Sequence, residues 1–199
     1  MRLYRALLLA ATLLALGVIS LGAYVRLSDA GLGCPDWPGC YGYLLGVPDT
    51  AHEHSVAQQA FPDSPVETHK AWKEMTHRYF AGTLGLLIVA IAALAWKQRR
   101  TPGESNQSPW IATGLVGIVG LQALLGMWTV TLLLRPVVVT AHLLGGMTTL
   151  ALLVWLLLSS GRTVKAEGRG RTGSLRFHAL LALLAVVAQI ALGGWVSSN

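Results

Sequence analysis

Two histidines lie inside apolar stretches of this chain. His77 belongs to the segment EMTHRYFAGTLG and His142 to the segment TAHLLGGM. Each lies about six residues, or about 9 Å at 1.5 Å per residue, from the outer end of an expected helix. Imidazoles at one depth on two helices of a bundle can bind the two faces of a haem iron. A lone intramembrane histidine more often makes a helix-packing hydrogen bond, so the pair leaves both interpretations open.

Glu74 is a third candidate, because it precedes His77 by three residues and so projects from the same side of a helix. A carboxylate at the edge of an apolar span costs free energy and usually has a function. The alternative is a first-turn acid that favours the helix N-terminus and pairs with Lys73 or Arg78. A di-iron centre would need several more carboxylates in the spans, and the sequence has none there.

Cys34 and Cys40 are the only cysteines, in the turn-rich segment RLSDAGLGCPDWPGCYG. On the oxidising side of a membrane a disulfide between them is the expected state. The ring would be short, so the bond is either a local structural link or an accessible, exchangeable one. Zinc is not expected without further ligands, and the missing C-x-x-C-H pattern excludes covalent haem attachment.

Several other polar residues could contribute to such a site. Arg26, Arg78 and Arg135 fall at the expected outer helix ends, where they would meet the propionates of a haem at that depth. Snorkelling to the membrane interface is the commoner role of any one of them. His52 and His54 fall in the outer loop and are expected to be solvated.

Apolar helices must position these residues, because 53% of the chain is hydrophobic and only 12% is charged, against roughly 25% charged in soluble domains. We predict an all-α integral membrane protein with a four-helix transmembrane bundle and a fifth helix. The net charge of +6 is attributed to basic cytoplasmic loops, and no nucleic acid partner is expected. Five uncharged stretches approach the roughly 20 residues of a span: 6–25, 79–96, 109–134, 136–160 and 177–196.

The distribution of Lys and Arg predicts a cytoplasmic N-terminus and an outer cysteine loop. Residues 1–160 then form the first bundle, with its outer cysteine loop at 26–70. Residues 161–176 form a cytoplasmic linker, and residues 177–199 form the first helix of a second bundle. Because the sequence ends at Asn199, where another outer loop should begin, a fragment or truncated product is expected.

An internal repeat supports this organisation. The third span ends in QALLGMW and the fifth in QIALGGW, while LGAYV closes the first. The second and fourth spans each have a histidine followed within a few residues by glycine. The repeat indicates a helix pair used twice, with the fifth span opening another round.

GAYVRLSDAGLGCPDWPGC, EMTHR and TAHLLGG occur here in an order and spacing that resemble the haem A synthase family, and the resemblance extends to LGGWVSSN. It implies a membrane oxidoreductase that converts haem O to haem A by oxidising a ring methyl to a formyl group, for use in terminal oxidases. It also implies two pseudo-symmetric four-helix bundles in an inner membrane. Haem O synthase and a terminal oxidase are the implied partners, and the electron donor stays unassigned.

By resemblance, His77 and His142 hold the substrate haem, Glu74 is the functional glutamate, and Cys34 and Cys40 are the paired outer cysteines. The family's second bundle, with its own histidine pair for haem b, is absent after the fifth span. We therefore expect the chain alone to be inactive. The alternatives are a bis-histidine b-type cytochrome subunit, which needs neither Glu74 nor the cysteine loop, and a non-catalytic haem-binding or assembly protein.

Overall fold

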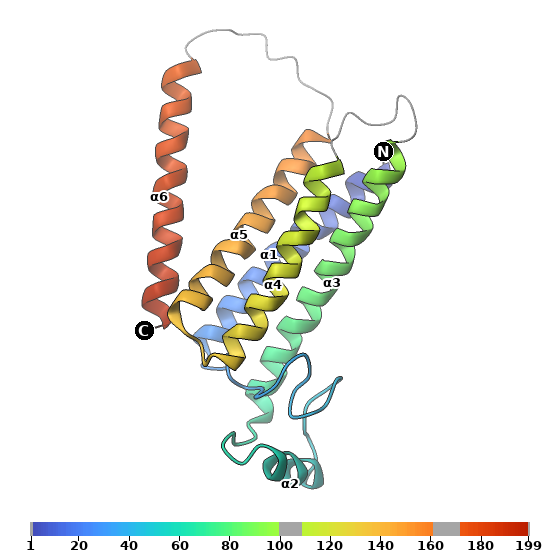
Figure 1. Cartoon of the computed structure of the whole chain (residues 1–199), viewed down its shortest axis with the longest axis vertical. Helices are drawn as coiled ribbons and strands as arrows, with labels where there is room; N and C mark the ends of the chain where they lie inside the picture. The colour runs from blue at the N-terminus through green and yellow to red at the C-terminus, as the bar shows by residue number, and fades with distance from the viewer. Residues whose placement is uncertain (1, 100–108, 161–171, 199) are drawn as a thin grey trace.

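A computed structural model describes residues 2–99, 109–160 and 172–198, and within these ranges it contains helices and no strand (Figure 1). The helices are α1 (Arg2–Leu27), α2 (Ala51–Ala60), α3 (Thr68–Arg99), α4 (Pro109–Thr131), α5 (Pro136–Ser159) and α6 (Thr172–Ser198). All except α2 are long and apolar enough to cross a membrane. The predicted all-α membrane class is confirmed.

Four of the helices form a closed bundle. Helix α1 packs against α3 and α5, and α4 packs against the same two helices. The main chains of α3 and α5 do not come close in their described parts, so these two helices are diagonal partners. In the described residues, helix α6 packs along α5 and stands beside the bundle, as Figure 1 shows, and its last turn also accepts a hydrogen bond from Arg26 of α1.

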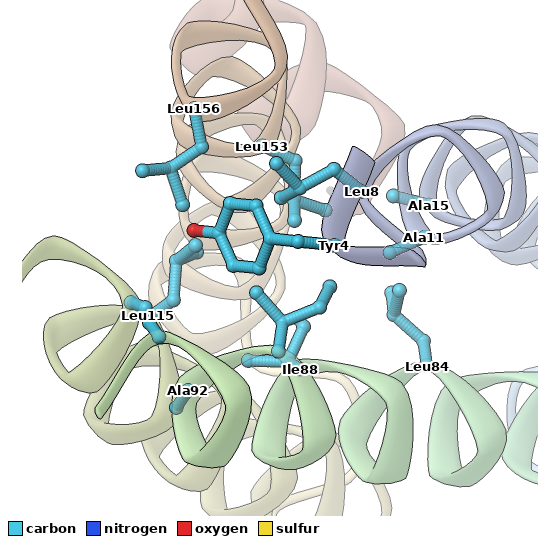
Figure 2. Packing of buried hydrophobic residues seen from close by; sticks show 13 residues of the cluster. Tyr4, Leu8, Ala11, Ala15, Leu84, Ile88, Ala92, Leu115, Leu153 and Leu156 are labelled. Atoms are coloured by element: carbon cyan, nitrogen blue, oxygen red, sulfur yellow. The ribbon is translucent and has the colours of Figure 1, made fainter. Parts of the chain in front are cut away.

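The larger buried cluster of the described residues lies at one end of the bundle. A buried cluster gathers the first half of α1, the second halves of α3 and α5, and the beginning of α4 (Figure 2). Tyr4, Leu8, Ile88, Leu115 and Leu153 are its larger members. Helices in a membrane are held together by close van der Waals packing of this kind, so this end anchors the bundle. His77 and His142 lie on the parts of α3 and α5 that this cluster does not reach.

Each predicted span corresponds to one helix, although the ends differ. Helix α3 starts at Thr68, well before the predicted span at 79, because its polar outer turns rest on the cysteine loop. Most of the predicted linker 161–176 lies outside the described residues, and its last part, 172–176, already belongs to α6.

The predicted outer loop contains one helix that the sequence interpretation missed. Thr50 caps α2 by accepting a hydrogen bond from the Glu53 N–H, and the Glu53 carboxylate accepts one from the Thr50 N–H. This reciprocal capping box fixes the first turn. His52 and His54 are therefore helical, and His54 Nε2 lies 2.9 Å from the Thr68 hydroxyl at the start of α3.

Candidate functional site

His77 belongs to α3 and His142 to α5, the two helices that lie diagonally in the bundle. The two histidines therefore face each other across its interior. Both are largely enclosed, and each ring lies within electrostatic reach of the other. The His77 ring also interacts with the main chain at Val18 of α1, and the His142 ring with the main chain at Gln122 of α4. The four helices of the bundle thus meet around one pair of imidazoles.

Each histidine ring lies against a glycine of the neighbouring helix. A methyl group at Gly22 of α1 would lie 3.0 Å from His77 Cε1, and one at Gly126 of α4 would lie 3.6 Å from His142 Cε1. Sequence reasoning saw these glycines in the repeat but did not assign them a partner. The corresponding glycine of α6 is Gly193, and no described atom lies within 4 Å of its Cβ position.

Unpaired buried polar atoms cluster around this pair. Nδ1 of His77 and Nδ1 of His142 are buried without a hydrogen-bond partner, as is Gln122 Nε2. The Gln122 amide lies against Gly145, one turn along α5 from His142. Buried polar groups are rarely left unsatisfied, so such a cluster points to a missing ligand. An imidazole with one nitrogen free and its ring fixed by a main-chain contact is the usual state of an iron ligand, and these residues fit a haem.

The cysteine loop covers the outer end of α3. Cys34 and Cys40 form a disulfide, as expected, and both residues are 0% exposed. A methyl group at Gly33 would lie 2.6 Å from the main chain at Lys70, so only glycine permits this close seat on α3. The alternative of an accessible disulfide is therefore wrong for this conformation, because the loop's own packing buries both sulfurs.

Glu74 and Arg78 connect this loop to the helix. Glu74 Oε2 accepts a hydrogen bond of 2.9 Å from the Cys34 N–H, and Oε1 accepts one of 2.5 Å from Arg78 Nη2. Arg78 Nη1 donates to the carbonyl oxygens of Asp36 at 3.0 Å, of Pro38 at 3.3 Å, and of Gly39. The guanidinium of Arg78 is thus used by the loop and Glu74, and its contact with a propionate stays a prediction.

The other two arginines differ from Arg78. Arg26 donates through Nη2 to the Ser197 carbonyl of α6, and its Nε is buried without a partner. Arg135 is exposed at the start of α5 and makes no side-chain capping bond. Among these three arginines, Arg26 is therefore the one whose printed contact reaches α6, in addition to the packing of α6 on α5.

Comparisons with known proteins place the whole bundle in one family. The family model described as cytochrome oxidase assembly protein (COX15-CtaA) matches residues 5–199. A protein named "Heme A synthase" from Shewanella oneidensis is 48% identical over 182 residues, covering 92% of this chain and 53% of the relative. One of the same name from Novosphingobium aromaticivorans is 30% identical over 199 residues, covering 90% and 55%.

The chain spans about half the length of the curated relatives it matches. No solved structure matches it. The five candidate spans and the family agree in describing a multi-pass membrane protein. Because the family model covers nearly the entire sequence, the chain belongs to the COX15-CtaA family of cytochrome oxidase assembly proteins.

Proposed function

We propose that this chain forms the haem O-binding half of a haem A synthase. One observation carries the proposal: His77 and His142 face each other from diagonal helices, each with a buried, unpaired Nδ1. Ligation of one iron by both rings would satisfy these nitrogens. The names of the relatives supply the reaction class, since the relatives matched here are called heme A synthase.

In this proposal His77 and His142 hold the substrate haem, and Gly22 and Gly126 leave room for the two rings. Bound haem O would supply the reacting group, a ring methyl that is oxidised to a formyl group. Glu74 lies about one turn outward of His77 on α3, so it is the carboxylate best placed to exchange protons at the outer edge of the bound ring. Arg78 and the Cys34 N–H fix that carboxylate in place.

We further propose an inner-membrane location, with the N-terminus in the cytoplasm and the cysteine loop outside. Haem O synthase and a terminal oxidase are the proposed partners upstream and downstream. A haem b is proposed for the second bundle of the longer relatives. Gly193 would serve there as Gly22 and Gly126 serve here, because it occupies the same place in the repeat.

The proposal is tested by expressing the chain in a host that makes haem O but no haem A. The chain is purified, its haem extracted, and haem O and haem A are separated by chromatography. The proposal expects bound haem O, and any haem A formed should disappear in Glu74→Gln while haem remains bound. Glu74→Gln keeps the shape of the side chain and removes its charge. Loss of haem from wild-type protein would contradict the proposal.

A non-catalytic haem-binding role is the second candidate. Both Glu74 oxygens already have partners in the loop and in Arg78, as a purely structural carboxylate would. Haem O bound without any haem A, unchanged in Glu74→Gln, fits this role, a bis-histidine b-type cytochrome and an inactive half of the enzyme alike. Haem A formation by the wild-type chain excludes all three.

A further inference from the structure

Glu74 and Arg78 make a contact pattern that haem ligation alone does not require. Both are nearly buried, with side chains 6% and 12% exposed. Their main-chain partners at Cys34, Asp36, Pro38 and Gly39 all belong to the ring closed by the disulfide. One charged pair therefore makes hydrogen bonds with both an N–H group and carbonyl oxygens of the same small ring.

The pair is absent from the other histidine helix. The positions three residues before and one residue after His77 are Glu74 and Arg78, whereas those around His142 are Val139 and Leu143. Helix α5 has no disulfide loop to hold, because residues 132–135 connect it directly to α4. The charges thus accompany the loop rather than the histidine.

The ring can donate and accept in this way only in its closed shape. The Cys34–Cys40 bond keeps the Cys34 N–H and the carbonyls of Asp36, Pro38 and Gly39 on one side of the loop, where α3 meets them. Both cysteines are 0% exposed, so a thiol reagent reaches the disulfide only after the ring lifts from α3. Lifting breaks the contacts of Arg78 with the ring and removes the main-chain partner of Glu74.

We infer that Arg78 is a positioning residue that couples the Cys34–Cys40 disulfide to Glu74. Nη1 holds the closed ring and Nη2 holds the carboxylate, so opening the disulfide releases Glu74, and removing Arg78 makes the disulfide easier to open. We call Arg78 with its contacts to the ring and to Glu74 the latch. The position of the latch above a haem rests on the proposed function. The coupling itself does not.

The chemistry of opening is thiol–disulfide exchange with an external dithiol. A thiolate of the dithiol attacks one cysteine sulfur and breaks the Sγ–Sγ bond, and its second thiol then closes the reagent's own disulfide. Two electrons pass from the reagent to the cysteines, which take up two protons as they become thiols. The latch opposes this step because it stabilises the closed ring.

The test measures the equilibrium between disulfide and thiols in the full chain, reconstituted in lipid nanodiscs without haem. The samples are equilibrated in mixtures of reduced and oxidised dithiothreitol, and free thiols are counted by a maleimide mass shift. Arg78→Gln should raise the equilibrium constant for reduction about tenfold, which is about 30 mV for two electrons. Arg78→Lys keeps the charge and should fall between it and the wild type.

Arg135→Gln is the matched control, since Arg135 is exposed and belongs to the connection between α4 and α5. It should leave the equilibrium unchanged. A constant for Arg78→Gln within twofold of the wild type overturns the inference. If Arg78→Gln does not fold, Glu74→Gln replaces it and must shift the equilibrium in the same direction.

A second measurement follows the coupling from the opposite side. Carbodiimide labelling of Glu74, located by peptide mass spectrometry, should rise several-fold when the wild-type disulfide is reduced, because the carboxylate loses the Cys34 N–H. Equal labelling before and after reduction contradicts the coupling. Neither measurement needs haem, so a failure here is distinguishable from a failure of the proposed function.

Discussion

The bundle contains two versions of one arrangement. The pair α1 and α3 places His77 against Gly22, and the pair α4 and α5 places His142 against Gly126. The connections within the pairs are very different. Residues 28–67 join α1 to α3 and include the disulfide ring and α2, whereas residues 132–135 join α4 to α5.

This difference separates the features that surround each histidine from the features that belong to the loop. Both pairs have a histidine that faces a glycine of the neighbouring helix, so this feature belongs to the surroundings of the histidines. What only the first pair has is Glu74, Arg78 and the buried disulfide, and these contact one another. The loop also reaches the second pair, since the Leu134 side chain lies against Gly31. One elaborated connection therefore covers the outer ends of both pairs.

The largest predicted difference between the pairs is at the position three residues before each histidine. Glu74→Ala leaves Arg78 buried without its carboxylate, and such a loss costs about 3–5 kcal/mol. We expect the outer loop to become sensitive to limited proteolysis. Val139→Ala is the matched change in the second pair and should leave the loop resistant. Equal sensitivity of the two variants would show that the charge pair does not hold the loop.

Removal of the disulfide should affect the first pair alone. Closing a ring this short stabilises a folded chain by about 2 kcal/mol, so Cys34→Ser with Cys40→Ser should speed proteolysis within 28–67. Cleavage between α4 and α5 should not change. If instead the whole bundle unfolds at a lower temperature, the loop and the helices are one cooperative unit and the distinction drawn here is wrong.

The two glycines that face the histidines should respond unequally to the same substitution. In Gly22→Ala the new methyl lies 3.0 Å from His77 Cε1, so the ring must shift, at a cost of about 1–2 kcal/mol. In Gly126→Ala the distance is 3.6 Å, an ordinary contact, and the helix gains the usual preference for alanine. Haem affinity should fall for Gly22→Ala and stay near wild type for Gly126→Ala. The opposite order would contradict the geometry.

The smallest effect concerns α2, which only the long connection has. Main-chain N–H groups of Thr50 and Asp49 donate to Glu53 and lower the pKa of its carboxyl. A lowered pKa means that this capping stabilises α2 above the ordinary carboxyl range and is lost as the pH falls through the lowered value. Hydrogen exchange of 51–54, corrected for intrinsic rates, should rise at acidic pH. Glu53→Gln should remove this dependence without altering α4 or α5.

The sequence was sufficient for features that depend on local composition. Runs of apolar residues predicted the five spans, and two cysteines in one outer segment predicted their disulfide. Helix α2 had a local signal too, the Thr50-x-x-Glu53 capping box. It was overlooked because prolines surround it and its own residues are not apolar.

Other features depend on contacts between distant segments. The guanidinium of Arg78 meets carbonyls at Asp36, Pro38 and Gly39, and main-chain carbonyls leave no mark in a sequence. The contact of Arg78 with the loop could therefore not be predicted from its place at a helix end. Gly22 and Gly126 were visible in the repeat, but the histidines they face became apparent only when the helices were packed.

The central claim is that His77 and His142 bind the two faces of one haem iron, and optical and electron paramagnetic resonance spectra of the purified, haem-loaded chain test it most directly. The wild-type spectrum should be that of a low-spin, bis-histidine haem. His77→Ala and His142→Ala should each lose that spectrum, becoming high-spin or losing haem. A full haem complement with an unchanged low-spin spectrum in either variant would contradict the claim.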